Sequence, residues 1–398
     1  MTQIYAQHIS VFIYMIFNKM NTDTTFDFEE ENLSSTNQQD LICSACGGHL
    51  KFDPASNKLK CETCGAEFDI KTSTKKIKEL DFDKFVEENM GTIEMQTLHT
   101  VECESCGAHV TFDENVVSDR CPFCGCILVV TNTVAATQIK PGSLLPFGLD
   151  KQQSFESFKK WIKALYFAPN DLSKRMTDIK ELQGIYVPYW TYDSDTNTSY
   201  HGERGTWYYA TETYTVNVNG KLETRTRQVR RTHWTPWSGS VHLFFDDVLV
   251  LASKSLSAKH ANYLEPWDLD KLVPYDEKYL SGFRTETYQI DLKDGFDTAK
   301  KIMDNRIYGA IRRDIGGDEQ RVTSKNTDYS AITFKHILLP VYISAYRYNN
   351  KVYQILVNAR TGEVQGERPY SFWKISLFTI FSIAAALLMA YLFGFFEQ

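Results

Sequence analysis

Residues 43–65 read CSACGGHLKFDPASNKLKCETCG, and residues 103–125 read CESCGAHVTFDENVVSDRCPFCG. The two stretches are copies of one pattern, C-x2-C-x14-C-x2-C, offset by 60 residues. This spacing is typical of zinc ribbons, in which two Cys-x2-Cys turns joined by a β-hairpin direct four thiolates at one metal ion. Because four protein ligands leave no position for a water molecule, the two expected Zn²⁺ ions are structural and not catalytic. The predicted ligands are Cys43, Cys46, Cys61, Cys64, Cys103, Cys106, Cys121 and Cys124.

Other ligand-type residues near these motifs are predicted to have different roles. His49 and His109 occupy equivalent positions in the two copies and are expected to be strand residues. Cys126 matches Ala66 of the first copy, so it is expected to pack beside the second motif as a thiol outside the metal site. All 9 cysteines fall between Cys43 and Cys126, which favours metal binding in a reducing compartment over disulfides. Redox iron, as in rubredoxin-like sites, is the weaker alternative for the metal.

The charge balance argues against nucleic-acid binding by these motifs. The chain has a formal net charge of −7, and residues 40–120 hold 9 Lys and Arg against 16 Asp and Glu. A surface that follows phosphates needs the opposite sign. The basic cluster of this region is expected to be a solvated face of a linker; it consists of Lys71, Lys75, Lys76 and Lys78. The motifs are therefore predicted to dock protein partners.

The C-terminus contains a predicted membrane span. The 22 residues from Ile375 to Phe396 carry no charge, and as a helix they would be about 33 Å long, enough to cross a hydrocarbon core of about 30 Å. A buried core helix is the alternative, but the run has no polar face to turn toward solvent. Arg368 and Lys374 precede it, so the positive-inside rule places the large N-terminal region in the cytoplasm. We expect a single-pass tail anchor in the bacterial cytoplasmic (inner) membrane.

The N-terminus is expected to be a disordered start. Residues 4–17 are largely apolar, but 14 residues are too few to span a bilayer, and no signal-peptide pattern surrounds them. A polar, acidic stretch begins at Met20. We expect translation to start at Met20, which would make residues 1–19 a mis-assigned start. The competing interpretation is a short interfacial anchor.

Hydrophobic periodicity organises the middle of the chain. Residues 151–166 place apolar side chains three and four apart, which predicts an amphipathic helix, and residues 295–314 do the same. Alternating, aromatic-rich segments surround the second helix. Asn219-Gly220 between two such segments predicts a β-hairpin, and further turns are expected at Asn349-Asn350 and Thr361-Gly362. We interpret residues 182–370 as one antiparallel α+β domain.

The sequence therefore predicts a multi-domain chain of two small four-cysteine zinc ribbons (β), an aromatic-rich antiparallel α+β domain and one C-terminal transmembrane helix. The predicted boundaries are 1–40, a disordered N-terminus; 41–70, the first zinc ribbon; 71–100, a helical linker; 101–131, the second zinc ribbon; 132–181, a linker with the amphipathic helix; 182–370, the α+β domain; and 371–398, the tail anchor.

One basic-aromatic patch occurs within the predicted α+β domain. Trp234 and Trp237 lie close in sequence to four arginines, which are Arg225, Arg227, Arg230 and Arg231. A tethered protein could use such a patch to contact lipid headgroups or phosphate. The alternative, which we favour, is an exposed strand face whose arginines pair with Glu212 and Glu223 across the hairpin.

The motif search gives no support for an enzyme. The sequence has no phosphate-binding loop of the form G-x4-G-K-[ST], no H-E-x-x-H, no G-x-S-x-G and no EF-hand loop. Asp246 and Asp247 are adjacent, as are Asp318 and Glu319, but neighbouring strand residues point to opposite faces. No small-molecule substrate is evident.

Several further segments carry a family resemblance. They are IKPGSLLPFGLD at 139–150, GIYVPYW at 184–190, RTRQVRRTHWTPWSG at 225–239, FFDDVLVLASKSL at 244–256, LEPWDL at 264–269, RRDIGGDEQR at 312–321 and LVNARTGEVQGERPYS at 356–371. From Cys43 to the C-terminus the chain resembles a bacterial family of zinc-ribbon proteins with a C-terminal membrane helix, commonly labelled replication-restart helicase (primosomal protein N′)-like. Because the sequence lacks a nucleotide-binding motif, we do not carry helicase activity over.

The resemblance also implies a cellular setting. Relatives are similar to membrane proteins encoded near phage-shock protein A-like and flotillin-like (SPFH) proteins, which implies a role in recruiting such proteins to a membrane. The expected function is a non-enzymatic, tail-anchored scaffold whose cytoplasmic zinc ribbons recruit protein partners. The alternative is a nucleic-acid-binding accessory of DNA replication or repair.

Overall fold

The computed structural model describes nine segments of the chain, which are 41–71, 76–87, 94–111, 118–129, 133–170, 172, 182–218, 220–349 and 351–392. The predictions for residues 1–40, a disordered start with translation from Met20, lie outside the described residues. From Cys43 onward the chain forms one compact unit.

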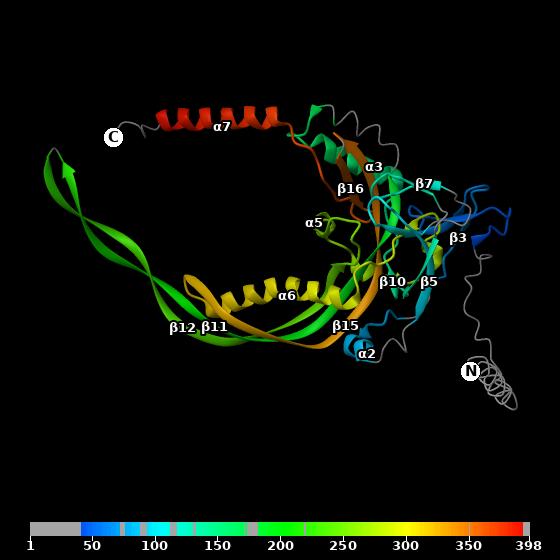
Figure 1. Cartoon of the computed structure of the whole chain (residues 1–398), viewed down its shortest axis with the longest axis horizontal. Coiled ribbons are helices and arrows are strands. Elements are labelled where there is room, and N and C mark those ends of the chain that lie inside the picture. Colours follow the sequence, from blue (N-terminus) through cyan, green and yellow to red (C-terminus); the bar gives the residue numbers. More distant parts are fainter. Residues whose placement is uncertain are drawn as a thin grey trace, which may run out of the picture. The chain divides into compact units, whose positions relative to one another are not determined.

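A nine-stranded mixed sheet forms the centre of this unit (Figure 1). Three long strands, β11 (Gln183–Val218), β12 (Lys221–Leu251) and β15 (Glu319–Tyr348), pair antiparallel in the order β12-β11-β15. The short strands that complete the sheet are β4 (Leu80–Asp81), β10 (Ser143–Leu144), β13 (Val273–Pro274), β14 (Arg284–Thr285), β16 (Lys351–Asn358) and β17 (Val364–Gly366).

Apolar side chains lie on both faces of the sheet along the first half of β11. Ile185, Val187 and Tyr189 pack into a core on one face, while Trp190 and Tyr192 pack into a second core on the other. Successive side chains of a strand point to opposite faces. Burial on both faces therefore explains why this part of the sequence is continuously apolar and not alternating.

Helix α6 (Leu292–Ile315) covers the second core. Its buried side chains recur every three or four residues and are Leu292, Phe296, Ala299, Met303, Ile307, Ile311 and Ile315. Tyr192 donates a hydrogen bond to the Leu292 carbonyl over 2.7 Å. A Cβ atom at Gly295 would lie 2.3 Å from the Tyr192 hydroxyl oxygen, so only glycine allows this approach of helix to strand. The helix predicted over 295–314 is confirmed.

Beyond the third strand, β11 and β12 continue as a two-stranded ribbon (Figure 1). Strand β15 ends its pairing with β11 at Glu319, opposite Gly205. We call residues 206–218 and 221–233 the hairpin arm. The pairing of Val218 with Lys221 leaves two residues in its turn, where Gly220 has φ +81°. The hairpin predicted at Asn219-Gly220 is confirmed, although Asn219 itself lies outside the described residues.

Each cysteine motif lies in a small sheet system of its own. The first cysteine unit, residues 43–68, has the sheet β1-β2-β3. The second cysteine unit, residues 95–139, has the sheet β5-β6-β9 and the pair β7-β8. Their strands are β1 (Leu50–Asp53), β2 (Lys58–Cys61), β3 (Glu67–Phe68), β5 (Met95–Glu102), β6 (His109–Thr111), β7 (Ser118–Arg120), β8 (Ile127–Val129) and β9 (Thr133–Ile139).

The segments predicted as linkers contribute strands as well as helices. Within 71–100 lie β4, which pairs with β15, and the short helix α2 (Phe82–Glu87). Within 132–181 lie β10, which pairs with β15 and β13, and helix α3 (Lys151–Lys163). Helix α3 begins with a capping box in which Asp150 and Gln153 exchange side-chain-to-backbone hydrogen bonds. The remaining helical elements are α5 (Ala258–Asn262), η2 (Leu269–Lys271) and η3 (Glu277–Tyr279).

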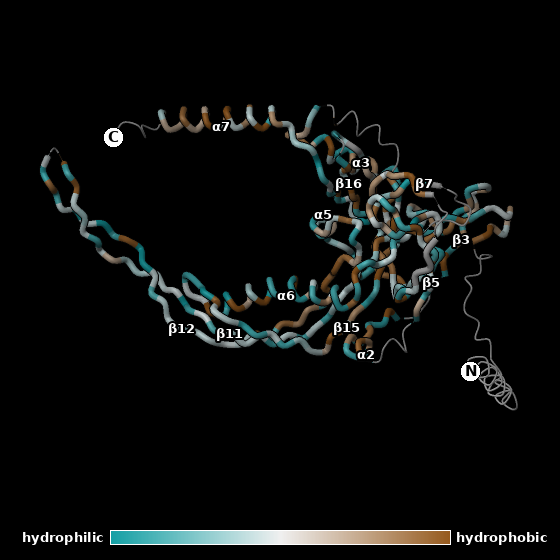
Figure 2. Tube along the Cα trace, viewed as in Figure 1, coloured by the Kyte–Doolittle hydropathy of each residue, from teal (hydrophilic) through white to brown (hydrophobic). Residues whose placement is uncertain are grey.

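One helix of the described chain is long and apolar enough to cross a membrane. Helix α7 (Phe372–Leu392) has 21 residues, includes an 18-residue stretch with a mean hydropathy of 2.2 and has no buried side chain. Figure 2 shows it largely in the brown of apolar residues. Its first turns are fixed to the loop after α3, since Ser371 N–H donates to the Phe167 carbonyl (2.7 Å) and Lys374 Nζ to the Ala168 carbonyl (2.7 Å).

Candidate metal centres

Four tight turns of the same form hold the eight predicted metal ligands. In each turn the N–H of a glycine donates to the carbonyl of the first cysteine, over distances of 2.7 to 3.0 Å. The glycines are Gly47, Gly65, Gly107 and Gly125, with φ between +71° and +74°. This left-handed conformation favours glycine because a Cβ atom would be strained there. The Cys-x2-Cys-Gly sequence therefore determines the turn that brings its two sulfurs together.

The sulfur atoms form two clusters, each with a geometry that suits one metal ion. In the first, Cys43 Sγ lies 3.6 Å from Cys64 Sγ, and Cys46 Sγ lies 3.4 Å from Cys61 Sγ. The second cluster repeats these distances at 3.5 Å for Cys103–Cys124 and 3.6 Å for Cys106–Cys121. A tetrahedron of Zn–S bonds of about 2.3 Å has S···S edges of about 3.8 Å, close to these values, whereas a disulfide would need about 2.05 Å.

Hydrogen bonds between the thiols of a cluster shift their pKa values in opposite directions. The pKa of Cys106 is lowered to about 5, chiefly because Cys121 donates a hydrogen bond to its sulfur, and the pKa of Cys121 is raised in return. Backbone N–H groups of Cys64 and Thr63 help to lower the pKa of Cys61 to about 6. Four neighbouring thiols cannot all ionise without a counter-charge. A divalent ion would supply it and convert all four to thiolates.

The first cysteine unit contacts the body along one strand. Phe52 of β1 packs edge-on against Tyr279, with ring centroids 5.2 Å apart. Phe52 N–H donates to the Ser281 carbonyl (3.0 Å), and Ser281 Oγ donates to the Leu50 carbonyl (2.7 Å). Of the four cysteines of this unit, Cys46 and Cys64 are exposed, whereas Cys43 and Cys61 are buried. One half of this metal site therefore faces solvent.

The second cysteine unit is part of the first core. Val101, Val110 and Phe123 are buried in the same cluster as the β11 and β15 side chains. Polar contacts add to this packing: Gln354 Nε2 donates to the Phe123 carbonyl (2.9 Å), and Gln289 Nε2 donates to the Gly107 carbonyl (2.8 Å). This metal site is integrated into the body, which sequence periodicity alone did not indicate.

The histidines and the ninth cysteine lie outside both four-sulfur clusters. His109 is in β6, as predicted, and its carbonyl accepts a hydrogen bond from Thr287 N–H over 3.2 Å. His49 is exposed and directly precedes β1. Cys126 is half-buried against the first core, and its carbonyl accepts from Cys121 N–H (2.7 Å). Neither cluster therefore includes a nitrogen ligand.

The structure divides the predicted arginine patch between the two faces of the hairpin arm. Arg227 and Arg231 both reach Glu212, over 3.3 and 2.7 Å, and Arg225 reaches Glu223 over 3.2 Å. Arg230, on the opposite face, lies over the Trp207 ring, 3.9 Å from its centroid. The acidic partners are those named from the sequence, although Glu223 lies on the same strand as Arg225.

The candidate carboxylate pairs make structural contacts. Asp247 lies 2.7 Å from Lys335 Nζ, and its backbone N–H donates to Asp193, which also accepts from Thr333 Oγ1 over 2.8 Å. An ammonium group thus lies where a cation would be needed in the cluster of Asp193, Asp246 and Asp247.

The second pair of acids is bound to one tryptophan. Asp318 accepts from Trp207 N–H and Glu319 from Trp207 Nε1, both over 2.8 Å. Both carboxylates therefore help to fix the base of the hairpin arm.

Sequence reasoning missed the most deeply buried acid of the described residues. Glu286 is buried beside the second cysteine unit, where it accepts a hydrogen bond from Ser253 Oγ over 2.9 Å. Burial raises its pKa to about 8. The segment around it, FRTETYQID, has an ordinary polar composition that does not indicate a buried position.

Comparison with known proteins identifies a distant relative. The chain is 23% identical over 337 residues to the uncharacterized protein YdjG of Bacillus subtilis strain 168, a match that covers 84% of this chain and 91% of the relative. No protein-family model matches the chain, and no solved structure matches it. The resemblance to primosomal protein N′-like sequences thus stays a prediction, while the match to YdjG extends over most of both chains.

Proposed function

We propose that this protein is a non-enzymatic scaffold that is anchored in the bacterial cytoplasmic membrane by α7 and recruits a protein partner through a zinc ribbon. The proposal combines two four-thiol sites, which would hold structural Zn²⁺, with an apolar helix that has no buried side chain. The large N-terminal region would lie in the cytoplasm, where reducing conditions preserve thiolate ligands.

The main support for the proposal is the unequal burial of the two cysteine units. The second unit shares the first core and would brace the sheet. The first unit contacts the body along β1 and leaves Cys46 and Cys64 exposed. A small ribbon cannot obtain enough stability from its own core, so the metal would keep this exposed surface rigid. We therefore assign partner recruitment to the first cysteine unit.

The surface of the first unit offers charged groups for specific docking. Lys51 pairs with Glu62 over 2.8 Å, and Lys58 pairs with Asp69 over 3.0 Å. Exposed pairs of this kind add little stability but contribute to the selection of a partner. The partner class is drawn from the sequence resemblance, which implies phage-shock protein A-like or SPFH proteins.

In-cell cross-linking of the full-length protein tests this assignment. A Cys64→Ser variant should lose its cross-links to the partner while it stays in the membrane fraction, because the change removes one ligand of the first site only. The matched control, Cys126→Ser, changes a cysteine outside both clusters and should keep the cross-links. Equal cross-linking by wild type and Cys64→Ser would show that the first unit does not recruit the partner.

One observation favours a second candidate, a nucleic-acid-binding accessory. The hairpin arm has five Lys and Arg residues against two Glu, a net charge of +3, and four exposed aromatic residues, Trp207, Tyr208, Tyr209 and Tyr214. Single strands bind to such basic-aromatic surfaces. This candidate predicts salt-dependent DNA affinity that is lost when Arg225, Arg227, Arg230 and Arg231 are all changed to Gln. Absence of binding at low salt would eliminate it.

A further inference from the structure

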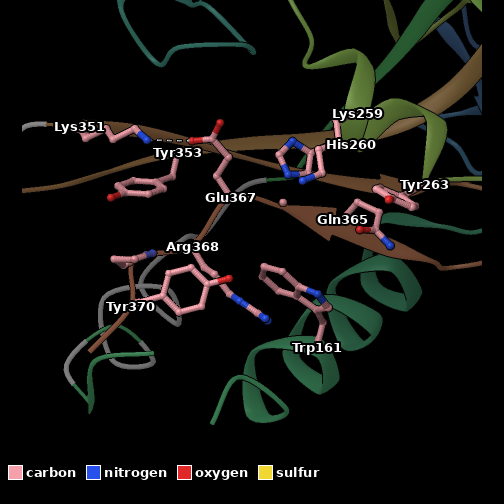
Figure 3. A pocket seen from close by; sticks show the side chains of 12 residues that line it. Trp161, Lys259, His260, Tyr263, Lys351, Tyr353, Gln365, Glu367, Arg368 and Tyr370 are labelled. Atoms are coloured by element: carbon pink, nitrogen blue, oxygen red, sulfur yellow. Dashed lines mark ion pairs between the residues drawn. The ribbon is translucent and has the colours of Figure 1, made fainter. Parts of the chain in front are cut away.

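A pocket lies directly before the N-terminus of α7. Its volume is about 580 Å³. Residues from four separate parts of the chain line it: Trp161 of α3, Lys259 and His260 of α5, Lys351 and Tyr353 of β16, and the segment 365–370 that leads into α7. Figure 3 shows these side chains around the opening, with Arg368 directed between Tyr370 and Trp161.

The pocket has an excess of positive charge. Its fixed cations are Lys259, Lys351 and Arg368, and its one carboxylate is Glu367. Glu367 is bound to Lys351, with 3.4 Å between Oε2 and Nζ. Within the described segments, Lys259 and Arg368 have no carboxylate partner in an ion pair. The pocket therefore contains two cations that are available to an anion, whereas three arginines of the hairpin arm already pair with glutamates.

Aromatic side chains surround these cations. The Arg368 guanidinium carbon lies 5.5 Å from the centre of the Tyr370 ring, and Lys351 Nζ lies 5.1 Å from that of Tyr353. Tyr353 stacks on Tyr346 with ring centroids 5.2 Å apart. Rings that combine an apolar body with a polar tip are enriched at the interface between membrane and water. The lining therefore suits a ligand with a phosphate group and an adjoining apolar part.

Contacts hold the pocket at a fixed position relative to the start of α7. Tyr370 lies two residues before α7, whose first residues Phe372 and Trp373 are both 76% exposed. Phe167, in the loop after α3, packs edge-on against Phe378 with ring centroids 5.4 Å apart. If α7 crosses a bilayer, the pocket therefore lies at the depth of the lipid headgroups.

We propose that this pocket binds the phosphate group of an anionic phospholipid. Arg368 and Lys259 would donate charge-assisted hydrogen bonds to the phosphate oxygens, and the tyrosine hydroxyls would bind the remaining headgroup. The headgroup position of the pocket rests on the proposed function, in which α7 spans the membrane. Inorganic phosphate shares the recognised chemistry, so the test must separate the two sources.

The test uses the full-length protein in detergent and with lipid vesicles. The pocket variant is Lys259→Gln with Arg368→Gln, and the control is Lys293→Gln with Lys301→Gln, which removes two exposed charges from α6. Native mass spectrometry in neutral detergent measures how much phosphatidylglycerol and phosphatidylcholine each protein retains. Thermal unfolding and zinc content verify that each variant is folded.

We expect wild type and control to retain phosphatidylglycerol about a hundredfold more strongly than the pocket variant, since each of the two lost charge-assisted bonds weakens binding about tenfold. Phosphatidylcholine should be retained less by wild type and should differ less among the three proteins, because its choline cation offsets the phosphate charge. Equal retention of phosphatidylglycerol by wild type and pocket variant would overturn the proposal. So would binding of inorganic phosphate to wild type with no preference for phosphatidylglycerol, which would make a free ion the ligand.

Membrane insertion is measured separately, as flotation with neutral phosphatidylcholine vesicles. Wild type and the pocket variant should both float, because the proposed lipid site is not needed for insertion. If neither floats, the membrane anchor is refuted, while the detergent measurement still reports on phosphate recognition. The two failures are therefore distinguishable.

Discussion

At the scale of single residues, Glu286 is buried where the second cysteine unit meets the sheet. Glu286 is 1% exposed, and its Oε2 atom has no hydrogen-bond partner within the described residues. A buried carboxyl without a cationic neighbour is more stable in its neutral form, so burial raises its pKa to about 8. Below pH 8 this residue is a neutral hydrogen-bonding group, and it would become a buried charge above that pH.

The pKa of Glu286 predicts a pH dependence of stability. The folded-state pKa of about 8 exceeds the ordinary glutamate pKa of 4.5. The contribution of Glu286 to the free energy of unfolding is therefore complete below pH 4.5 and is lost as the pH rises through 8. From pH 6 to pH 8 the free energy of unfolding should fall by about 2 kcal/mol. Chemical denaturation of a Glu286→Gln variant should lack this decrease. Parallel curves for the two proteins would contradict the assignment.

The metal ligands predict an asymmetry between the two units. Cys61→Ser and Cys121→Ser should each reduce the zinc content from two ions to one per chain. Only Cys121→Ser should lower the unfolding temperature of the whole body, because the second unit shares the first core. Emission spectrometry and calorimetry check both results, with Cys126→Ser as a control that keeps two ions. Equal loss of thermal stability in both ligand variants would contradict the asymmetry.

At the scale of elements, short sequence patterns predicted turns and helices but did not predict how far the strands pair. The turn at Gly220 and the helix α6 follow from neighbouring residues, and both are present. The length of β11, 36 residues, could not be predicted. Alternation of apolar and polar residues does not indicate where strand pairing ends. Strands β4 and β10 have two residues each and form only through pairing with strands distant in sequence, β15 for β4 and both β15 and β13 for β10.

The hairpin arm should be dispensable for folding. Among the described residues, neither core cluster includes a side chain from 206–233. Replacing residues 208–231 by an Asn-Gly turn between Trp207 and Thr232, which are paired in the sheet, should therefore change the unfolding temperature by no more than a few degrees. Circular dichroism on purified protein measures this. A loss of cooperative unfolding would show that the arm stabilises the body.

At the scale of the whole molecule, the sequence predicted the chemistry of the sites better than their surroundings. The spacing of the eight cysteines indicated two clusters, and the structure assembles both. The sequence did not indicate that one cluster is integrated into the core, since Gln289 and Gln354 lie 182 and 231 residues from the groups that they bind in the second unit. The pocket before α7 was missed for the same reason, because Trp161, Lys259 and Arg368 are distant in sequence.

The membrane anchor is the property on which the proposed scaffold depends most. Helix α7 has no buried side chain, so a water-soluble protein would expose 21 residues of high mean hydropathy to solvent. The most direct measurement is alkaline carbonate extraction of cell membranes, comparing the full-length protein with a chain that ends at Tyr370. The account predicts that the full-length protein stays in the membrane pellet while the shortened chain is released. Full-length protein in the supernatant would contradict it.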